Sequence, residues 1–502
     1  MLGVILAAAY SILFFFLIKR MSFFSINGIE RKWLVGVFIL KLLAGTGLWF
    51  IYTYYYPKRT VADIFKYFDD GLIMYNTLFT KPVDFLKMFF GVNDDAFIIT
   101  YYSAMKFWLL QYDTGLYNEN TTLIRFNALC DIFSFGNYHV HTVFICFLSL
   151  TGLTGIYKSF SPYLPDKRIG LFIIVFLVPS ILFWSSAVLK EGLVFFALGM
   201  CLFYYFKLVK NKFSSAVLVG FIFFFFLLSI SKLYVSLVIT PAFITHAIIT
   251  KTNYRWPELK YILVFSILFV LAYNVPNYHL PSMIADKKSQ AISLARGGSY
   301  ICNTIVNKYV LIDSKYENRI TYLKGYPDYC KIVPGVSYYY WQKESPDKKT
   351  FVENSKDTLT YYVFFDHPPA GSYINIPDLN GTYLSMIKNA PVAFINTAFR
   401  PTIFEANSFL MFISAIENLI IIAFMLICIF FASRKIEHKH LIYFCLCGTV
   451  LLFVLIGLTT PILGSVVRYR TPMLPFLLIP FLLIIDKERL IKALPFTRKM
   501  LG

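Results

Sequence analysis

Apolar runs of about 15 to 25 residues recur along the whole chain. A run of this length crosses the roughly 30 Å hydrocarbon core of a bilayer as a helix, and a helix satisfies its own backbone hydrogen bonds in lipid. We therefore predict an all-α polytopic membrane protein. Eleven runs are predicted to span the membrane: 2–18, 33–56, 138–157, 170–185, 187–208, 214–231, 233–250, 259–275, 408–432, 440–459 and 471–485.

The composition excludes an ordinary soluble globule. Hydrophobic residues make up 58% of the chain and charged residues only 15%, and the mean hydropathy is +0.62. The net charge of +19 could suggest a nucleic-acid partner, but no compact basic domain carries it. Most of the excess lies in short segments between apolar runs, where basic residues act as orientation signals. No nucleic-acid partner is therefore expected.

The orientation signals also divide the chain into parts. Lys19 and Arg20 follow the first run and no basic segment precedes it, which is unlike a cleavable signal peptide and predicts an outside N-terminus. The same alternation continues through all eleven runs and predicts a cytoplasmic C-terminus. The expected parts are helices 1–8 within residues 1–275, with an external loop 57–137 that carries surface-lying helices; an external domain, 276–407; and helices 9–11 within residues 408–502.

Three carboxylates lie near the start of the first external loop. On a helix, Asp63 and Asp70 share one face, whereas Asp69 is turned away by about 100°. This pattern predicts acid–base chemistry at a membrane surface. The alternative is an amphipathic helix that lies on the bilayer without a chemical role. The apolar side chains that enter the interface in that alternative are Ile64, Phe65 and Phe68.

Several other charges lie at the expected outer ends of the spans rather than on the cytoplasmic side. They are Lys190, Glu191, Lys232, Arg400, Arg468 and Arg470. Charges at this depth are costly and usually have a partner or a task. Arg468 and Arg470 could together hold a phosphate, because guanidinium groups bind phosphate bidentately. The alternatives are an ion pair between Lys190 and Glu191 that reaches the interface, and ordinary lipid headgroups bound by the two arginines.

Glu417 lies about ten residues into the ninth predicted span. We interpret it as a structural hydrogen-bonding group between helices. Cys302 and Cys330 are the two cysteines of the predicted external domain. They could form a disulfide outside a cytoplasmic membrane or remain reduced, and their spacing does not decide between the two.

Carboxylates and cations gathered at one outer cavity, under the domain 276–407, favour group transfer from an isoprenoid phosphate carrier. The cations neutralise the leaving phosphate, and a carboxylate takes the proton of an acceptor hydroxyl as it attacks the anomeric carbon of a sugar. The sequence contains no Gly-rich phosphate loop, HExxH motif or Cys-His metal cluster. No cofactor is expected with certainty, and a divalent cation at Asp69 and Asp70 is left open.

This layout resembles the GT-C superfamily of integral-membrane glycosyltransferases, near the mannosyltransferase-like family 39 type. The resemblance is carried by the acidic first external loop, by the segment from Pro179-Ser180 to Lys190-Glu191, by Phe399-Arg400-Pro401, and by Arg468-Tyr469-Arg470-Thr471-Pro472-Met473-Leu474-Pro475. It implies a catalytic carboxylate among Asp63, Asp69 and Asp70. It also implies carrier-phosphate binding by Lys190, Glu191, Arg400, Arg468 and Arg470.

The resemblance implies an inverting transfer from a polyprenyl-phosphate-linked sugar to an envelope glycan, lipid or protein acceptor, with membrane lipids around the protein. The expected location is a bacterial cytoplasmic membrane. One departure is that the larger external domain precedes three closing helices instead of following the last span. Two alternatives stay open: an O-antigen or capsule polysaccharide polymerase, and a transporter or flippase of lipid-linked glycans.

Overall fold

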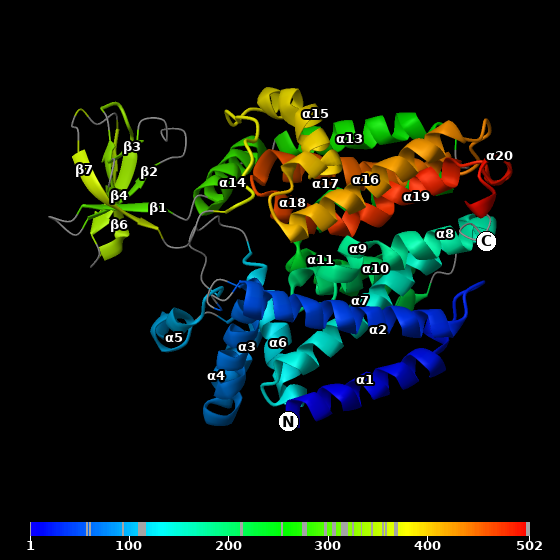
Figure 1. The fold of residues 1–502 in the computed structure, drawn as a ribbon, viewed down its shortest axis with the longest axis horizontal. Helices are drawn as coiled ribbons and strands as arrows, with labels where there is room; N and C mark the ends of the chain where they lie inside the picture. Colours follow the sequence, from blue (N-terminus) through cyan, green and yellow to red (C-terminus); the bar gives the residue numbers. More distant parts are fainter. Residues whose placement is uncertain are drawn as a thin grey trace. The chain divides into compact units, whose positions relative to one another are not determined.

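The structure, a computed structural model, describes most of the chain and divides it into two compact units (Figure 1). The first unit comprises Met1–Leu271, Pro401–Leu452 and Arg468–Gly502, and the second comprises Ala272–Arg400 and Phe453–Val467. The described residues are 2–497 without 57–58, 60–61, 93–94, 109–116, 211–213, 253–254, 274–278, 296–298, 304–307, 313–319, 324–325, 333, 343–344, 354–355, 357–358 and 366–369.

The first unit is built mainly of helices. Its helices are α1 (Leu2–Arg20), α2 (Arg31–Phe50), α3 (Asp63–Thr80), α4 (Pro82–Phe90), α5 (Asp95–Thr100), α6 (Asn120–Ser134), α7 (Tyr138–Phe160), α8 (Arg168–Phe172), α9 (Pro179–Trp184), α10 (Lys190–Val209), α11 (Ser215–Ser231), α12 (Leu233–Lys251), α13 (Pro257–Tyr273), α16 (Phe409–Phe430), α17 (Lys439–Thr459), α18 (Leu463–Arg470), α19 (Leu474–Ile484) and α20 (Lys487–Ala493). The end of α13, the end of α17 and the start of α18 belong to the second unit.

Among the described residues, eight helical stretches are long and apolar enough to cross a membrane. They are Gly3–Arg20, Arg31–Tyr55, Tyr138–Tyr163, Lys190–Val209, Leu233–Lys251, Phe409–Phe430, Lys439–Thr459 and Leu463–Ile484, and Ser215–Ser231 is a shorter apolar helix. The chain is therefore a multi-pass helical membrane protein. The predicted span 170–185 is not one straight helix, because the backbone is extended at Val178, between α8 with its π-helical continuation and α9.

Helices α7 and α10 approach each other closely at two glycines. A Cβ added at Gly199 of α10 lies 1.9 Å from the carbonyl oxygen of Gly152 of α7. Only glycine fits such an approach, and small residues are what allow two membrane helices to pack backbone to backbone. This contact fixes α10, whose first turn carries two of the predicted site residues.

Two of the basic residues in the first unit donate hydrogen bonds to the backbone at the ends of other helices. The Lys167 ammonium group donates to the carbonyl oxygens of Leu482 and Ile485, at 2.9 and 2.7 Å. The Arg31 guanidinium donates to the carbonyl oxygen of Lys19, which joins the start of α2 to the end of α1. The prediction that the basic segments share one side, the cytoplasm, stays a prediction.

The second unit contains helices and a sheet. Its helices include α14 (Leu280–Ala295) and α15 (Tyr383–Phe399), and Ile284 of α14, Ala393 of α15 and Leu458 of α17 form one buried cluster. The strands are β1 (Ser299–Asn303), β2 (Lys308–Ile312), β3 (Ile320–Leu323), β4 (Tyr326–Ile332), β5 (Tyr338–Gln342), β6 (Ser345–Val352) and β7 (Leu359–Phe365). They form one sheet in the order β3-β4-β7-β1-β2-β5-β6, and all the pairings are antiparallel.

The sheet register places the backbone of Cys302 and Cys330, the two cysteines of the predicted external domain. Cys302 on β1 is opposite Tyr362 of β7, and Cys330 on β4 is opposite Tyr361 of β7. Strand β7 therefore lies between them, and two strand spacings place their Cα atoms about 10 Å apart. The side chains of Cys302 and Cys330 lie outside the described part of the chain, and the question whether they form a disulfide stays open.

Candidate functional site

Four charged residues from four helix ends meet in the first unit, and we call them the charge network: Asp63, Glu191, Lys232 and Arg468. Asp63 is the first residue of α3, Glu191 lies in the first turn of α10, and Lys232 separates α11 from α12. An Nη1 group of Arg468 donates to Asp63 Oδ2 at 2.7 Å. Arg468 Nε lies 3.0 Å from Glu191 Oε2, and Lys232 Nζ donates to Glu191 Oε1 at 2.8 Å. One carboxylate thus bridges two cations.

Burial falls steadily along the charge network. The side chains of Glu191 and Lys232 are 0% and 1% exposed, Arg468 is 10% exposed, and Asp63 is 35% exposed. Buried charges are tolerated only when they are paired, and removing one partner leaves the other without compensation. Glu191 and Lys232 are therefore anchors, whereas Asp63 is the member of the charge network that an outside molecule can reach.

Aromatic rings cover the cations. Lys232 Nζ lies 4.7 Å from the ring centroid of Tyr469 and 5.4 Å from that of Tyr234. The guanidinium carbon of Arg468 lies 5.8 Å from the ring of Trp184 and 6.0 Å from the ring of Tyr469. Each ring face attracts a cation and also excludes water from it. The ring of Tyr469 lies near both cations and so links Lys232 to Arg468.

A second ion pair joins the first residue of α10 to Glu119, at the start of α6. Lys190 Nζ donates to Glu119 Oε1 at 2.6 Å and to Asn120 Oδ1 at 3.1 Å. The Tyr67 hydroxyl donates to the same Asn120 oxygen at 2.9 Å. Tyr67 is one helical turn from Asp63, so both side chains project from one face of α3. Burial raises the pKa of Tyr67 and keeps its hydroxyl protonated as a hydrogen-bond donor.

A buried lysine in α2 fastens the loop that leads to Lys190. Lys41 is fully buried, and its ammonium group donates to the hydroxyl of Ser185 at 2.5 Å and to its carbonyl oxygen at 3.2 Å. The next carbonyl, that of Ser186, presses so closely on Gly45 that an added Cβ there lies 2.2 Å away. Helix α2 therefore holds the loop between α9 and α10 through both a charge and a close backbone contact.

Glu417 fastens the opposite end of α9. Its carboxylate accepts from the backbone N–H of Ser180, with the shorter contact at 3.1 Å, and from the Ser180 hydroxyl at 2.7 Å. A negative group at the N-terminus of a helix and a positive group at its C-terminus both complement the helix dipole. Glu417 and Lys41 occupy these two positions on α9. The prediction that Glu417 makes a structural hydrogen bond between helices agrees with this geometry.

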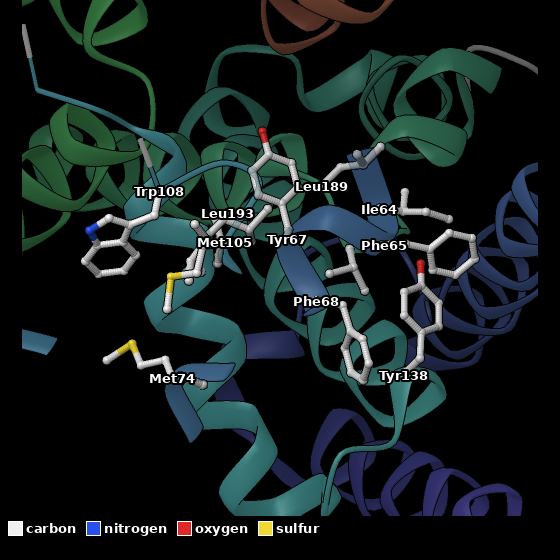
Figure 2. Packing of buried hydrophobic residues seen from close by; sticks show 14 of the residues in the cluster. Ile64, Phe65, Tyr67, Phe68, Met74, Met105, Trp108, Tyr138, Leu189 and Leu193 are labelled. Carbon is white, nitrogen blue, oxygen red and sulfur yellow. The ribbon is translucent and has the colours of Figure 1, made fainter. Parts of the chain in front are cut away.

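Helix α3 packs into the protein and does not lie on a bilayer surface. Ile64, Phe65 and Phe68 are almost fully buried, in a cluster that also contains Tyr138 and Leu189 (Figure 2). The alternative in which these three side chains enter the membrane interface is therefore wrong, because other protein side chains already cover them. Packing on both sides fixes the first turn of α3, and with it the position of Asp63.

The other two carboxylates of α3 have separate partners. Asp70 is 1% exposed, and its two oxygens accept the backbone N–H groups of Lys106 and Phe107 at 2.8 and 2.7 Å. Burial raises the pKa of Asp70. Asp69 is exposed and forms an ion pair with Arg59. The structure therefore brings Asp63 into the charge network and leaves Asp69 and Asp70 outside it.

Arg468 and Arg470 do not form one clamp. Residues two apart on a helix point about 200° apart, and the two guanidinium groups accordingly reach different partners. Arg470 is buried, and its Nη2 donates to Asn418 Oδ1 at 3.3 Å. Arg400 lies at the end of α15 in the second unit, where its Nη1 lies 3.4 Å from Asn396 Oδ1.

The sequence pattern does not identify several of the site residues. Lys232 was placed at an outer helix end but was not assigned to the site, although a lone lysine between two apolar runs is the available signal. Lys41 gives a similar signal inside an apolar run. Glu119, Asn120 and Tyr67 give none, because nothing in the sequence places them beside Lys190.

Within the part of the chain that the structure describes, no group of three or more His, Cys, Asp or Glu side chains is arranged to hold a metal ion. Asp69 and Asp70, the pair considered for a divalent cation, face different partners. A comparison with known proteins found no matching protein-family model, no matching curated protein and no matching solved structure. The fold and site therefore define the class: a multi-pass helical membrane protein with a charge network at the ends of its helices.

The burial of the charge network leads us to predict how a substitution changes the stability of the folded protein. Glu191→Gln leaves Lys232 buried without its ion-pair partner, which typically costs about 3–5 kcal/mol. We expect a clear fall in the unfolding temperature of the purified protein in detergent, measured by the exposure of buried thiols on heating. The matched control is Asp69→Asn, which breaks an exposed pair and should change the stability by less than about 1 kcal/mol. Equal effects of the two substitutions would contradict the anchoring role of Glu191.

Proposed function

We propose that the protein is a GT-C-type membrane glycosyltransferase, which moves a sugar from a polyprenyl-phosphate-linked donor to an envelope glycan, lipid or protein acceptor. In this proposal the chain has eleven spans, an outside N-terminus and a cytoplasmic C-terminus in a bacterial cytoplasmic membrane, and the reaction occurs at the outer face. The observation that carries the proposal is the accessible carboxylate of Asp63, held at 2.7 Å by Arg468 among anchored cations.

Asp63 is the base in the proposed reaction. Its carboxylate takes the proton of an acceptor hydroxyl while the oxygen of that hydroxyl attacks the anomeric carbon of the sugar. The bond between this carbon and the carrier phosphate oxygen breaks, and the phosphate leaves with the electron pair. A single displacement of this kind inverts the anomeric centre. Asp63 suits the role because it is the most exposed member of the charge network and its position is fixed by Arg468.

Arg468 links the two charge movements of the reaction. Before transfer, its guanidinium group is paired with ionised Asp63. As Asp63 gains a proton it loses its negative charge, and at the same moment negative charge grows on the leaving phosphate. The positive charge of Arg468 can then stabilise the phosphate without a change in the total charge around it. Glu191 keeps Arg468 in place throughout, because it contacts Nε rather than Nη1.

Lys190 is the cation that we assign to the carrier phosphate before the reaction. Its side chain is 13% exposed and that of its partner Glu119 is 25% exposed, so this ion pair is more accessible than the pair of Glu191 and Lys232. An entering phosphate can therefore replace Glu119 at the Lys190 ammonium group while the buried pair stays intact. Lys190 adjoins Glu191 in the first turn of α10, which places phosphate binding beside the charge network.

The proposal predicts the effect of removing the base. Asp63→Asn should lower the rate of transfer by about 10²–10⁴-fold, the usual contribution of a positioned general base. The assay measures radiolabelled sugar moved from membrane-extracted polyprenyl-phosphate donors to cell-envelope acceptors at matched protein levels. Asp69→Asn and Asp70→Asn are compared in the same assay, and Asp63→Asn should give the largest loss.

Glu30→Gln is the control, because it removes an exposed carboxylate that pairs only locally, with Lys32, before the start of α2. Transfer by Asp63→Asn at the rate of this control, with equal unfolding temperatures, would contradict the role of Asp63. If no donor supports transfer and the protein moves lipid-linked glycan across the membrane of vesicles, the protein is a transporter and the enzyme proposal is wrong.

A further inference from the structure

A basic hollow lies beside the ends of α16 and α19 in the first unit. It has a volume of about 440 Å³ and is lined by Ser433, Arg434, Lys435, Asp486 and Arg489. Two segments far apart in the sequence form it: the connection from α16 to α17 and the junction of α19 with α20. The volume lies in the range of small-molecule sites, and the lining has three cations for one carboxylate.

The rim of the basic hollow is a fixed piece of backbone. The N–H of Ser433 donates to the carbonyl oxygen of Ile484 at 2.7 Å, and the N–H of Asp486 donates to that of Phe431 at 2.8 Å. These two bonds flank an antiparallel bridge between Ala432 and Ile485. The two segments are therefore tied together before any ligand arrives, so the hollow is preformed.

Two of the three cations of the basic hollow are available to a ligand, whereas Arg489 donates from Nη1 to the carbonyl oxygen of Ala432 at 3.4 Å. Arg434 and Lys435 are exposed, and among the described residues neither side chain has an ion-pair partner. The carboxylate of Asp486 is engaged locally, because its Oδ1 accepts the backbone N–H of Arg489 at 3.1 Å. Three cations in a concave site, with the one acid already partly satisfied, favour an anion such as a phosphate group.

The basic hollow also adjoins the ends of two helical stretches that are long and apolar enough to cross a membrane. It begins within a few residues of Phe430, the last residue of α16, and of Ile484, the last residue of α19. The outward face of α16 below it is apolar and uncovered by protein, with Phe430 76% exposed and Leu426 and Ile420 also exposed. In a bilayer such a face contacts acyl chains, and the phosphate groups lie just beyond the end of the apolar helix.

We propose that the basic hollow binds the phosphate of an anionic phospholipid, whose acyl chains lie along the exposed face of α16. This follows the general preference of basic pockets at membrane boundaries for anionic headgroups. A neighbouring hollow of about 290 Å³ offers a contrast, because its lining includes two carboxylates, Glu258 and Glu437, and one lysine. The proposal is independent of glycosyl transfer, since none of these residues belongs to the charge network.

The test measures lipid binding to the full chain in detergent by native mass spectrometry, with phosphatidylglycerol and phosphatidylcholine compared at equal concentrations. The wild type should retain phosphatidylglycerol preferentially. Arg434→Gln with Lys435→Gln should weaken phosphatidylglycerol binding roughly 30-fold, from about fivefold for each basic residue removed near a membrane surface. The single substitution Arg489→Gln gives a second reading from the other segment of the hollow and should weaken binding about fivefold.

The matched control is Lys19→Gln with Arg20→Gln, which removes two exposed cations from the end of α1, away from the basic hollow. It should bind phosphatidylglycerol as the wild type does. Equal losses in the two double variants would overturn the site, because they would show only a general attraction to positive charge. Displacement of the lipid by an excess of inorganic phosphate would overturn the assignment to a lipid and give the hollow to a soluble phosphate compound instead.

Discussion

The contact between the Glu191 carboxylate and two cations is the constraint on which the site depends. Lys232 and Arg468 come from segments more than two hundred residues apart, and neither could stay buried without this carboxylate. The bridge therefore fixes the start of α10, the junction of α11 with α12, and α18 relative to one another. Asp63 then meets an arginine whose position is already determined, so its exposed carboxylate is held in a defined place.

Charged groups inside the helical bundle have a second structural task, which is to hold α9. This short helix follows a break in an apolar segment, and such a break leaves backbone groups without helical partners. Glu417 accepts the free N–H at its start, and Lys41 donates to the carbonyl oxygen beyond its end. The helix carries Trp184, which covers Arg468, and leads into the loop before Lys190. Glu417 and Lys41 thus stabilise the parts that surround the charge network, and their hydrogen bonds offset the cost of burying the two charges.

The sequence predicted the helical membrane part of the fold well, because long apolar runs have one stable structure in lipid. Eight of the eleven predicted spans overlap described helical stretches that are long and apolar enough to cross a membrane. Of the other three, 214–231 is a shorter apolar helix, 259–275 overlaps α13, and 170–185 is broken at Val178. Helix α6 was not predicted, because its buried polar residues, among them Asn127 and Asp131, resemble those of a loop. The seven-stranded sheet within the predicted external domain was not predicted either, because its short strands give a much weaker pattern than a membrane helix.

The site was predicted in part, for reasons that particular residues make clear. Glu191, Lys190 and Arg468 were recognisable because each places a charge next to an apolar run, where charge is expensive. The pairing of Asp63 with Arg468 spans 405 positions in the sequence, and no local pattern encodes it. The expected clamp by Arg468 and Arg470 failed because neighbours two apart on a helix point in different directions.

A double-mutant cycle on the transfer reaction tests the central claim most directly. The rates of the wild type, Asp63→Asn, Arg468→Gln and the double variant are compared in the sugar-transfer assay, with unfolding temperatures measured on the same samples. If Asp63 and Arg468 act as one unit, the double variant should be at least about tenfold faster than the product of the two single losses predicts, a coupling of about 1.4 kcal/mol. Losses that multiply independently would contradict the account, because they would mean that the observed ion pair has no part in the reaction.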